Sequence, residues 1–234
     1  MKQSIALLLA SLLWLTAWSA KAAKTDLEPS WKKGHFRARM GAWPKSLNYH
    51  NANGVYLGWI YQHAGVQLLK YSMDDFSDLP FLADRWTVGK DQLTYTFFLN
   101  KEATWADGKP ITAHDVVFTF ELVYDKKRCV TCEPVRAFRG EYEYAKAIDD
   151  HTFRIKMKNK HYQNLSRLGS MYLVQKSRIG NKDYNKKFNK DVMDGGPYTY
   201  DKKASKFRKT VVLKRRKNYW ANKYDHFKNR FNLT

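Results

Sequence analysis

Cys129 and Cys132 are the only two cysteines of the 234-residue chain and stand three residues apart. A Cys-x-x-Cys pair suits a local disulfide, a redox-active dithiol or half of a zinc site. A redox pair normally begins a helix, whose dipole lowers a thiol pKa, but here Lys126-Lys127-Arg128 precedes the pair and Pro134 follows it. Zinc needs four ligands, and this segment offers two. We expect a structural disulfide that stiffens the loop, with redox exchange and metal binding as alternatives.

No other group of residues indicates catalysis. The seven histidines are scattered without a His-Glu-x-x-His pair, and no serine lies in a Gly-x-Ser-x-Gly elbow. Asp107 and Asp115 form a conceivable acid/base pair, but turn and helix-cap roles account for both. The chain is therefore predicted not to be an enzyme, with no catalytic residue, no metal ligand and no cofactor.

The segment 103–121 joins a turn to the start of a helix. Asp107-Gly108-Lys109-Pro110 has turn chemistry, because Asp hydrogen-bonds its own downstream backbone, Gly accepts a positive φ and Pro cannot continue a ladder. Thr112 fits an N-cap, and Asp115 fits the acidic partner of a capping box. Val116, Val117, Phe120 and Val123 then recur at helical spacing. This pattern predicts a helix that begins just after Pro110.

This block resembles the signature of the family 5 solute-binding proteins of ABC importers, the dipeptide- and oligopeptide-binding group. The matching residues are Trp105, Asp107, Gly108, Pro110, Thr112, Ala113, Asp115 and Val116. The resemblance implies an α/β fold, namely the first lobe of a two-lobed periplasmic binding protein of type II in the peptide-binding cluster. It also implies noncatalytic binding of a peptide or small solute in an interlobe cleft, and an inner-membrane ABC permease as partner.

Further segments resemble the family in the same order and predict local structure. Segment 44–48 resembles an entry loop, and 54–71 reads as an amphipathic helix with Val55, Ile60, Val66 and Leu69 available for a core. Segment 79–86 reads as a short turn or helical piece that leads into a strand. Thr94–Leu99 is a predicted strand, and 149–157 predicts a turn followed by an exposed-edge or half-buried strand.

The extent of the resemblance suggests part of a binding protein. It begins near Gly41 and continues through Gly195-Gly196-Pro197-Tyr198 to Asn218-Tyr219-Trp220, where chains of the family are still within their first lobe. We therefore expect residues 23–234 to be an incomplete N-terminal lobe, truncated before the second lobe. A truncated product without binding activity is one alternative.

The resemblance also suggests which residues contact a ligand. Asn53, Gly54 and Val55 align with a stretch that contacts the peptide backbone, where Gly permits close approach. An acidic residue often stands at the position of Asn53 in the family. Gly196 and Tyr198 correspond to a segment near the hinge and cleft. These five residues are the expected ligand-binding set.

The N-terminus predicts export. Lys2 supplies a positive charge, Ile5 to Trp18 is an apolar run too short for a stable membrane span, and Ala20-Lys21-Ala22 fits a signal peptidase site. Residues 1–22 are thus an expected signal peptide cleaved after Ala22, leaving a periplasmic protein without a membrane span. An uncleaved anchor is the alternative.

The chain is strongly basic, with a formal net charge of +20. From residue 201 on, Asp201 and Asp225 oppose twelve basic residues: Lys202, Lys203, Lys206, Arg208, Lys209, Lys214, Arg215, Arg216, Lys217, Lys223, Lys228 and Arg230. Such a run is usually a solvated face. A basic binder of nucleic acid or of an anionic polymer is the functional alternative, with anionic lipid headgroups a further partner for weak attraction. Export argues against nucleic acid, so we expect no nucleic-acid partner.

Overall fold

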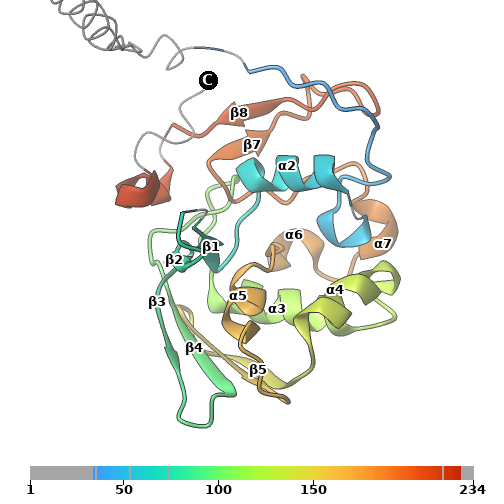
Figure 1. Cartoon of the computed structure of the whole chain (residues 1–234). Helices are drawn as coiled ribbons and strands as arrows, with labels where there is room; N and C mark the ends of the chain where they lie inside the picture. Colours follow the sequence, from blue (N-terminus) through green and yellow to red (C-terminus); the bar gives the residue numbers. More distant parts are fainter. Residues whose placement is uncertain (1–33, 35, 53, 73, 218, 228–234) are drawn as a thin grey trace, which may run out of the picture.

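A four-stranded antiparallel sheet lies at one end of the computed structural model, which describes residues 34, 36–52, 54–72, 74–217 and 219–227 (Figure 1). Its strands are β3 (Ala83–Val88), β4 (Thr94–Leu99), β5 (Tyr142–Asp149) and β6 (Thr152–Met157), in the spatial order β3-β4-β6-β5. Phe97 of β4 pairs with Trp86 on one side and with Phe153 on the other. Aromatic and β-branched residues of this kind favour such pairs across a sheet.

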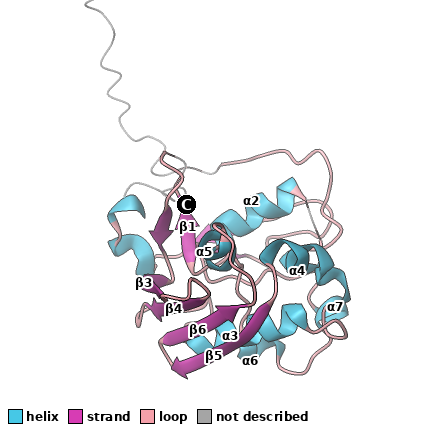
Figure 2. Cartoon of the chain, turned by 60° about the horizontal axis from the view of Figure 1, so that its bottom comes forward, coloured by secondary structure: helices cyan, strands magenta, loops and turns pink. Residues whose placement is uncertain are grey.

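Helix α3 (Ala113–Tyr124) covers one face of this sheet, as Figure 2 shows against β5 and β6. Its buried residues include Val116, Phe120 and Val123, which recur at helical spacing. The Phe120 ring stacks on that of Phe153, with centroids 5.5 Å apart. Alternate residues of β6 point into this layer, and the rest are half-buried.

The remaining elements extend from α3 and the sheet toward the opposite end of the molecule. Helix α2 (Val55–Ala64) lies below the hairpin of β7 (Tyr198–Tyr200) and β8 (Leu213–Arg215) in Figure 1. A second two-stranded sheet pairs β1 (Leu69–Tyr71) with β2 (Asp78–Pro80). The other helices are α4 (Glu133–Arg139), α5 (Asn164–Gly169), α6 (Lys176–Ile179) and α7 (Tyr184–Lys187), with 3-10 turns at Tyr49–Asn51, Val130–Cys132, Trp220–Lys223 and Asp225–Phe227.

The helix predicted over 54–71 is shorter than expected. It ends at Ala64, and residues 69–71 form β1 instead. The carbonyl of Ala64 accepts the amides of Gly195 and Gly196 at 2.9 and 2.8 Å, and a Cβ on Gly65 would lie 2.5 Å from the Tyr172 ring. These tertiary contacts hold the chain extended after Ala64. Val66 and Leu69 are still buried, whereas Val55 is exposed.

The strand predictions were mostly right. Thr94–Leu99 is β4, as predicted, and the segment after the turn at 149–151 is β6. β6 is half-buried, but it lies inside the sheet rather than at an edge, because β5 pairs along its outer side. β5 itself was not predicted. Segment 79–86 contains parts of β2 and β3 and no helical piece.

The predicted signal peptide, residues 1–22, lies outside the described residues. Among the residues that are described, no helix combines the length and apolar character needed to cross a bilayer.

Candidate functional site

Asp115 is the centre of the signature block. Thr112 is the N-cap of α3, and its amide donates to Asp115 Oδ2 at 3.1 Å in a capping box. The same oxygen accepts from Trp105 Nε1 at 3.3 Å, and Oδ1 accepts the backbone amide of Lys176 at 2.8 Å. Because the side chain is buried, each of these donors would lose its partner inside the protein without it. Asp115 therefore joins the turn, the helix start and α6.

Two more contacts attach the segment before α6 to the same block. The Thr119 hydroxyl donates to the Asp115 carbonyl at 2.8 Å and accepts the Val174 amide at 3.0 Å. Asp107 Oδ2 accepts from Gln175 Nε2 at 2.9 Å, while Oδ1 accepts the Lys109 amide at 3.2 Å across the turn. Gly108 sits in this turn at φ 83°, a conformation that favours glycine. These contacts are structural and leave no carboxylate pair for acid/base chemistry.

The other signature residues are packing residues. Trp105, Ala113 and Val116 are buried, and Pro110 forms an isolated bridge with Thr104 that closes the turn. The signature thus positions the chain around the start of α3.

Arg216 connects this block to the glycine pair at 195–196. Its Nη1 donates to the Thr104, Gly195 and Gly196 carbonyls at 3.0, 3.3 and 3.3 Å. Its Nη2 donates to Thr104 Oγ1 and the Trp105 carbonyl at 2.8 and 3.1 Å. Burial lowers the pKa of Arg216. A planar guanidinium fits this set of carbonyls better than a point charge would. In the sequence, Arg216 is predicted only as one cation of a basic run.

Gly196 and Tyr198, two of the predicted ligand residues, lie behind the C-terminal end of α2. A Cβ on Gly196 would lie 2.6 Å from the His63 carbonyl oxygen, so packing alone requires glycine there. Tyr198 is buried, and its ring meets that of His63 edge-on at 5.8 Å. Both residues hold α2 in place.

Gly54 and Val55 lie at the opposite, N-terminal end of α2, about 14 Å from Ala64 at 1.5 Å per residue. The structure therefore does not bring the predicted ligand residues into one cluster. Val55 is 68% exposed, and Trp59, one turn later, is 45% exposed. Asn53, the remaining predicted residue, lies outside the described residues. Trp59 was not predicted, although its spacing of four from Val55 places it on the same helix face.

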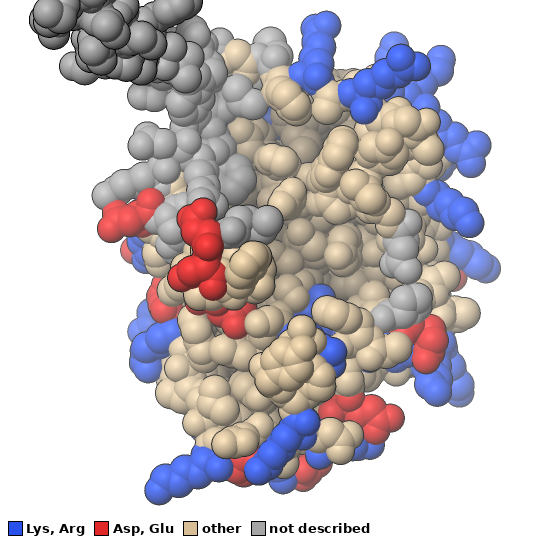
Figure 3. Space-filling view, viewed as in Figure 1, with Lys and Arg blue, Asp and Glu red and all other residues tan. Residues whose placement is uncertain are grey.

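Packing does not require glycine at Gly54, the N-cap of α2, or at Gly58 within the helix. A Cβ added to Gly54 or to Gly58 would meet nothing within 4 Å, and neither residue has a left-handed φ. Glycine inside a helix costs about 0.5–1 kcal/mol relative to alanine. We call Gly54, Val55, Gly58 and Trp59 the α2 strip. Figure 3, oriented as Figure 1, shows a hollowed face below the position of α2 with few charged side chains at its centre.

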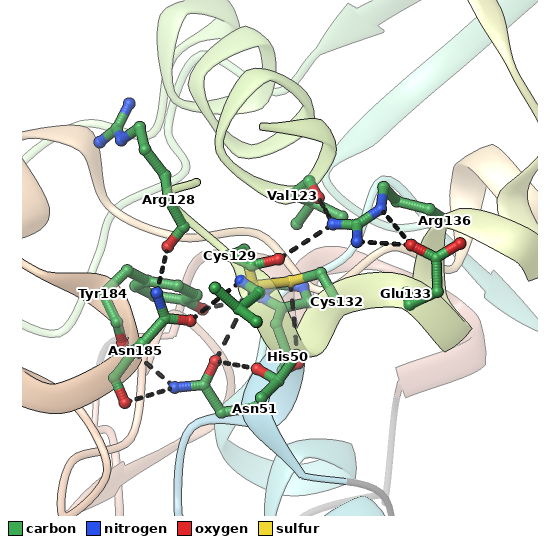
Figure 4. The surroundings of a disulfide bond; sticks show 12 residues. His50, Asn51, Val123, Arg128, Cys129, Cys132, Glu133, Arg136, Tyr184 and Asn185 are labelled. Atoms are coloured by element: carbon green, nitrogen blue, oxygen red, sulfur yellow. Dashed lines mark hydrogen bonds and ion pairs between the residues drawn. A yellow bond between two sulfur atoms is a disulfide. The ribbon is translucent and has the colours of Figure 1, made fainter. Parts of the chain in front are cut away.

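A disulfide joins Cys129 and Cys132 in the loop after α3 (Figure 4). Arg136 Nη1 donates to the Cys129 and Val123 carbonyls at 3.0 and 2.8 Å, and Asn51 Oδ1 accepts from the Thr131 hydroxyl at 2.8 Å. The bridge spans one local loop and is buried at both sulfurs. Its neighbours anchor this loop to α4 and to the turn at 49–51.

A buried histidine and a buried arginine lie near this loop. His50 Nδ1 is 2.7 Å from the Tyr184 hydroxyl, and burial, with Arg139 nearby, lowers the pKa of His50 to about 3. Arg139 donates to the hydroxyl and carbonyl of Ser170 at 2.8 and 3.0 Å, and burial lowers its pKa to about 10. At neutral pH the histidine is thus uncharged and the arginine charged.

A polar pocket of about 500 Å³ opens beside the signature turn. Its lining includes Asp107, Arg178 and Asp194. Arg178 pairs with Asp194 at 3.2 Å, and burial raises the pKa of Asp194 against the opposing effect of that arginine. Arg178 and Asp194 thus already pair with each other, and Asp107 already accepts from Gln175 and pairs with Lys109 at 3.6 Å. Within the described part of the chain, no group of three or more His, Cys, Asp or Glu residues could hold a metal ion.

Comparison with known proteins gives one consistent family. The model for bacterial extracellular solute-binding proteins, family 5 Middle, matches residues 79–231. The oligopeptide-binding protein AliB of Streptococcus pneumoniae is 29% identical over 199 residues, which cover 76% of this chain and 30% of AliB. The periplasmic oligopeptide-binding protein OppA of Escherichia coli is 27% identical over 203 residues, covering 78% of this chain and 36% of OppA.

Solved structures share the same fold. The crystal structure of Haemophilus influenzae OppA in complex with the peptide RPPGFSPFR aligns with a TM-score of 0.62 and 24% identity, covering 77% of this chain and 38% of that one. The chain spans about a third of the length of these relatives. Its mixed α/β fold accordingly matches about a third of their structures.

Proposed function

The chain belongs to the bacterial extracellular solute-binding proteins of family 5, a noncatalytic transport family, and from this premise we propose that it binds peptides or similar solutes for an ABC importer. The α2 strip forms one wall of the binding site. The partner is an inner-membrane permease, and the place of action is the periplasm after cleavage of residues 1–22.

The observation that carries this proposal is the pair of glycines on α2. Gly65, Gly195 and Gly196 each pack so tightly that a Cβ would meet another atom at 2.5–2.8 Å. Gly54 and Gly58 face open space instead. Glycine suits the N-cap position of Gly54, whereas Gly58 lies inside the helix, where no contact within the described chain needs a glycine. Close approach of an external ligand gives a physical reason for glycine at position 58.

The start of α2 adds groups that can bind a peptide. The backbone amides of the first turn of any helix have no acceptor within the helix. Gly54 is the N-cap of α2 and has no side chain that could accept from them. Those amides and the positive end of the helix dipole favour a carboxylate or a peptide carbonyl. Val55 and Trp59 offer exposed apolar surface beside them. A peptide laid along α2 would meet polar groups at one end and apolar groups along its length.

Gly58→Ala tests the proposal, with Gln62→Ala as the matched control. Both positions lie on α2 away from the buried core, and alanine favours the helix at each. In calorimetric or fluorescence titrations with a mixed tripeptide to pentapeptide library, Gly58→Ala should weaken binding at least about tenfold because its methyl group blocks the approach. Gln62→Ala should change binding less. Equal affinities for the parent and Gly58→Ala, or no binding by either protein, would refute this role for the strip.

A further inference from the structure

The connection between β7 and β8 is an ordered hairpin rather than a loose loop. The Asp201 amide donates to the Val212 carbonyl at 2.9 Å, and the Thr210 amide donates to the Lys206 carbonyl at 2.8 Å. Lys206 and Thr210 form an isolated bridge that narrows the tip. We call residues 201–212 the basic hairpin.

The basic hairpin carries a dense positive charge on fixed backbone. Lys202, Lys203, Lys206, Arg208 and Lys209 are all exposed. Asp201 is the only acidic residue between 195 and 224, and Lys214 Nζ lies 2.5 Å from its carboxylate. The nearby Asp191 pairs with Arg178 at 2.7 Å and with Lys202 of the hairpin at 3.6 Å. The acidic groups nearest the hairpin therefore leave most of its charge uncompensated.

A second segment extends this charge. Trp43 packs edge-on against Phe207 of the basic hairpin with ring centroids 5.7 Å apart, so the chain before α2 runs beside the hairpin (Figure 1). This segment adds exposed Arg37, Arg39 and Lys45, and no acidic residue lies between 36 and 48. Figure 3 shows Lys and Arg side chains along the upper and right-hand border, where these two segments lie in Figure 1.

We propose that the basic hairpin and segment 36–45 together bind the surface of an anionic lipid bilayer. Each Lys or Arg near such a surface strengthens attraction to the headgroups, and the aliphatic stems of these side chains suit the interface. Phe36, which is 76% exposed, supplies an aromatic ring at the same surface. Anionic lipid would thus hold the protein near the membrane, and this attachment would not depend on which solute the protein binds.

The shape of the surface favours a bilayer over single-stranded nucleic acid. Nucleic-acid binders of that kind use a basic groove with aromatic faces on which bases stack. Here the charges project from a hairpin, and the Phe207 ring already contacts Trp43, Lys190 at 5.1 Å and Arg208 at 5.7 Å. The projecting basic tip can contact a plane of lipid headgroups. Its Phe207 ring, already in contact with neighbouring side chains, offers no free face on which a base could stack.

Vesicle co-sedimentation of the full chain tests this proposal. Vesicles of phosphatidylcholine with about 30% phosphatidylglycerol are compared with vesicles of phosphatidylcholine alone, because the apolar run at 5–18 would act on both kinds. The test variant combines Lys203→Gln, Lys206→Gln, Arg208→Gln and Lys209→Gln. The control combines Lys90→Gln, Lys126→Gln, Lys146→Gln and Lys160→Gln, which are exposed elsewhere and change the net charge equally.

The unaltered chain should prefer the anionic vesicles, and the preference should fall as NaCl is raised. The test variant should lose at least about tenfold in partition coefficient, since each cation at the surface contributes about fivefold. The control should lose less than about threefold. Equal losses in both variants, equal binding to the two kinds of vesicle, or tight binding only to single-stranded DNA at the same salt would overturn the proposal.

Discussion

The Asp115 carboxylate accepts the backbone amide of Lys176 at 2.8 Å across a sequence separation of 61 residues. The same carboxylate caps α3 through the Thr112 amide and holds the Trp105 indole. A motif that reads locally as a turn and a helix cap thus also fixes a distant segment. Asp115 therefore contributes more to the stability of the fold than a helix cap alone would contribute.

Asp115→Ala should therefore destabilise the fold by about 3 kcal/mol, because it leaves several buried donors without acceptors. Asp74→Ala, which removes an exposed carboxylate, should change stability by less than about 0.5 kcal/mol. Chemical denaturation of both variants beside the parent measures the difference. Equal midpoints for Asp115→Ala and the parent would show that the carboxylate is not the link.

Opposite effects are expected from two glycine substitutions. Gly58→Ala should stabilise the protein by about 0.5–1 kcal/mol, since the added methyl group meets open space in a helix. Gly196→Ala should destabilise it by about 2 kcal/mol or more, because the methyl group would lie 2.6 Å from the His63 carbonyl oxygen. Thermal unfolding of the two variants checks the signs. A stabilising Gly196→Ala would contradict the packing behind α2.

The local patterns in the sequence predicted local structure well. The start of α3 and the strand 94–99 follow from capping, turn chemistry and β-branched residues that need no distant partner. The end of α2 could not be predicted, because Ala64 and Gly65 are held by Gly196 and Tyr172 from far along the chain. β5 was missed since its exposed edge carries polar residues that give no clear alternation.

The candidate site was predictable only in part. The sequence pointed to Gly54 and Val55 through resemblance, and the open space beside Gly58 could be found only from the structure. The same resemblance predicted Gly196 as a ligand-binding residue, and its packing against the His63 carbonyl accounts for the glycine at this position. Arg216 looked like one more surface cation, whereas its five acceptors come from segments more than 15 residues earlier in sequence.

His50 should make stability depend on pH. Its pKa is lowered to about 3 in the folded protein, while an unfolded histidine has a pKa of about 6.5. Its contribution is present above pH 6.5 and is lost as pH falls from there toward 3, by up to about 1.4 kcal/mol per pH unit, because the unfolded chain takes up the proton. His50→Gln should be less stable than the parent at pH 7.5.

That disadvantage should shrink as pH falls from 6.5 to 4. His161→Gln, which alters an exposed histidine, is the control variant. Urea unfolding at several pH values measures these slopes. A constant stability difference between His50→Gln and the parent across this range would mean that His50 is protonated in the folded protein.

Loss of the disulfide should act on stability alone. The double variant Cys129→Ser with Cys132→Ser should unfold about 2 kcal/mol more easily, the value expected for a closed loop of four residues. Peptide affinity should not change, because the α2 strip contains neither cysteine. If the parent instead reduced insulin disulfides and the variant did not, the pair would be redox-active rather than structural.

Export can be tested on the chain as it is made in a cell. The small residues Ala20 and Ala22 predict that the periplasmic form begins at Ala23 or within one residue of it. N-terminal sequencing of periplasmic protein identifies the start directly. A start at Met1 would indicate an uncleaved anchor instead.

The most direct test of the central claim is to map peptide binding onto α2. Because the chain spans about a third of the length of its relatives, we expect weak binding, with a dissociation constant of about 1 mM, or about −4 kcal/mol. In an NMR titration of the isotopically labelled chain with mixed-sequence peptides, the amide signals of Val55 to Trp59 should shift together and saturate. Saturable shifts confined to other segments, or none at several-fold that concentration, would contradict the account.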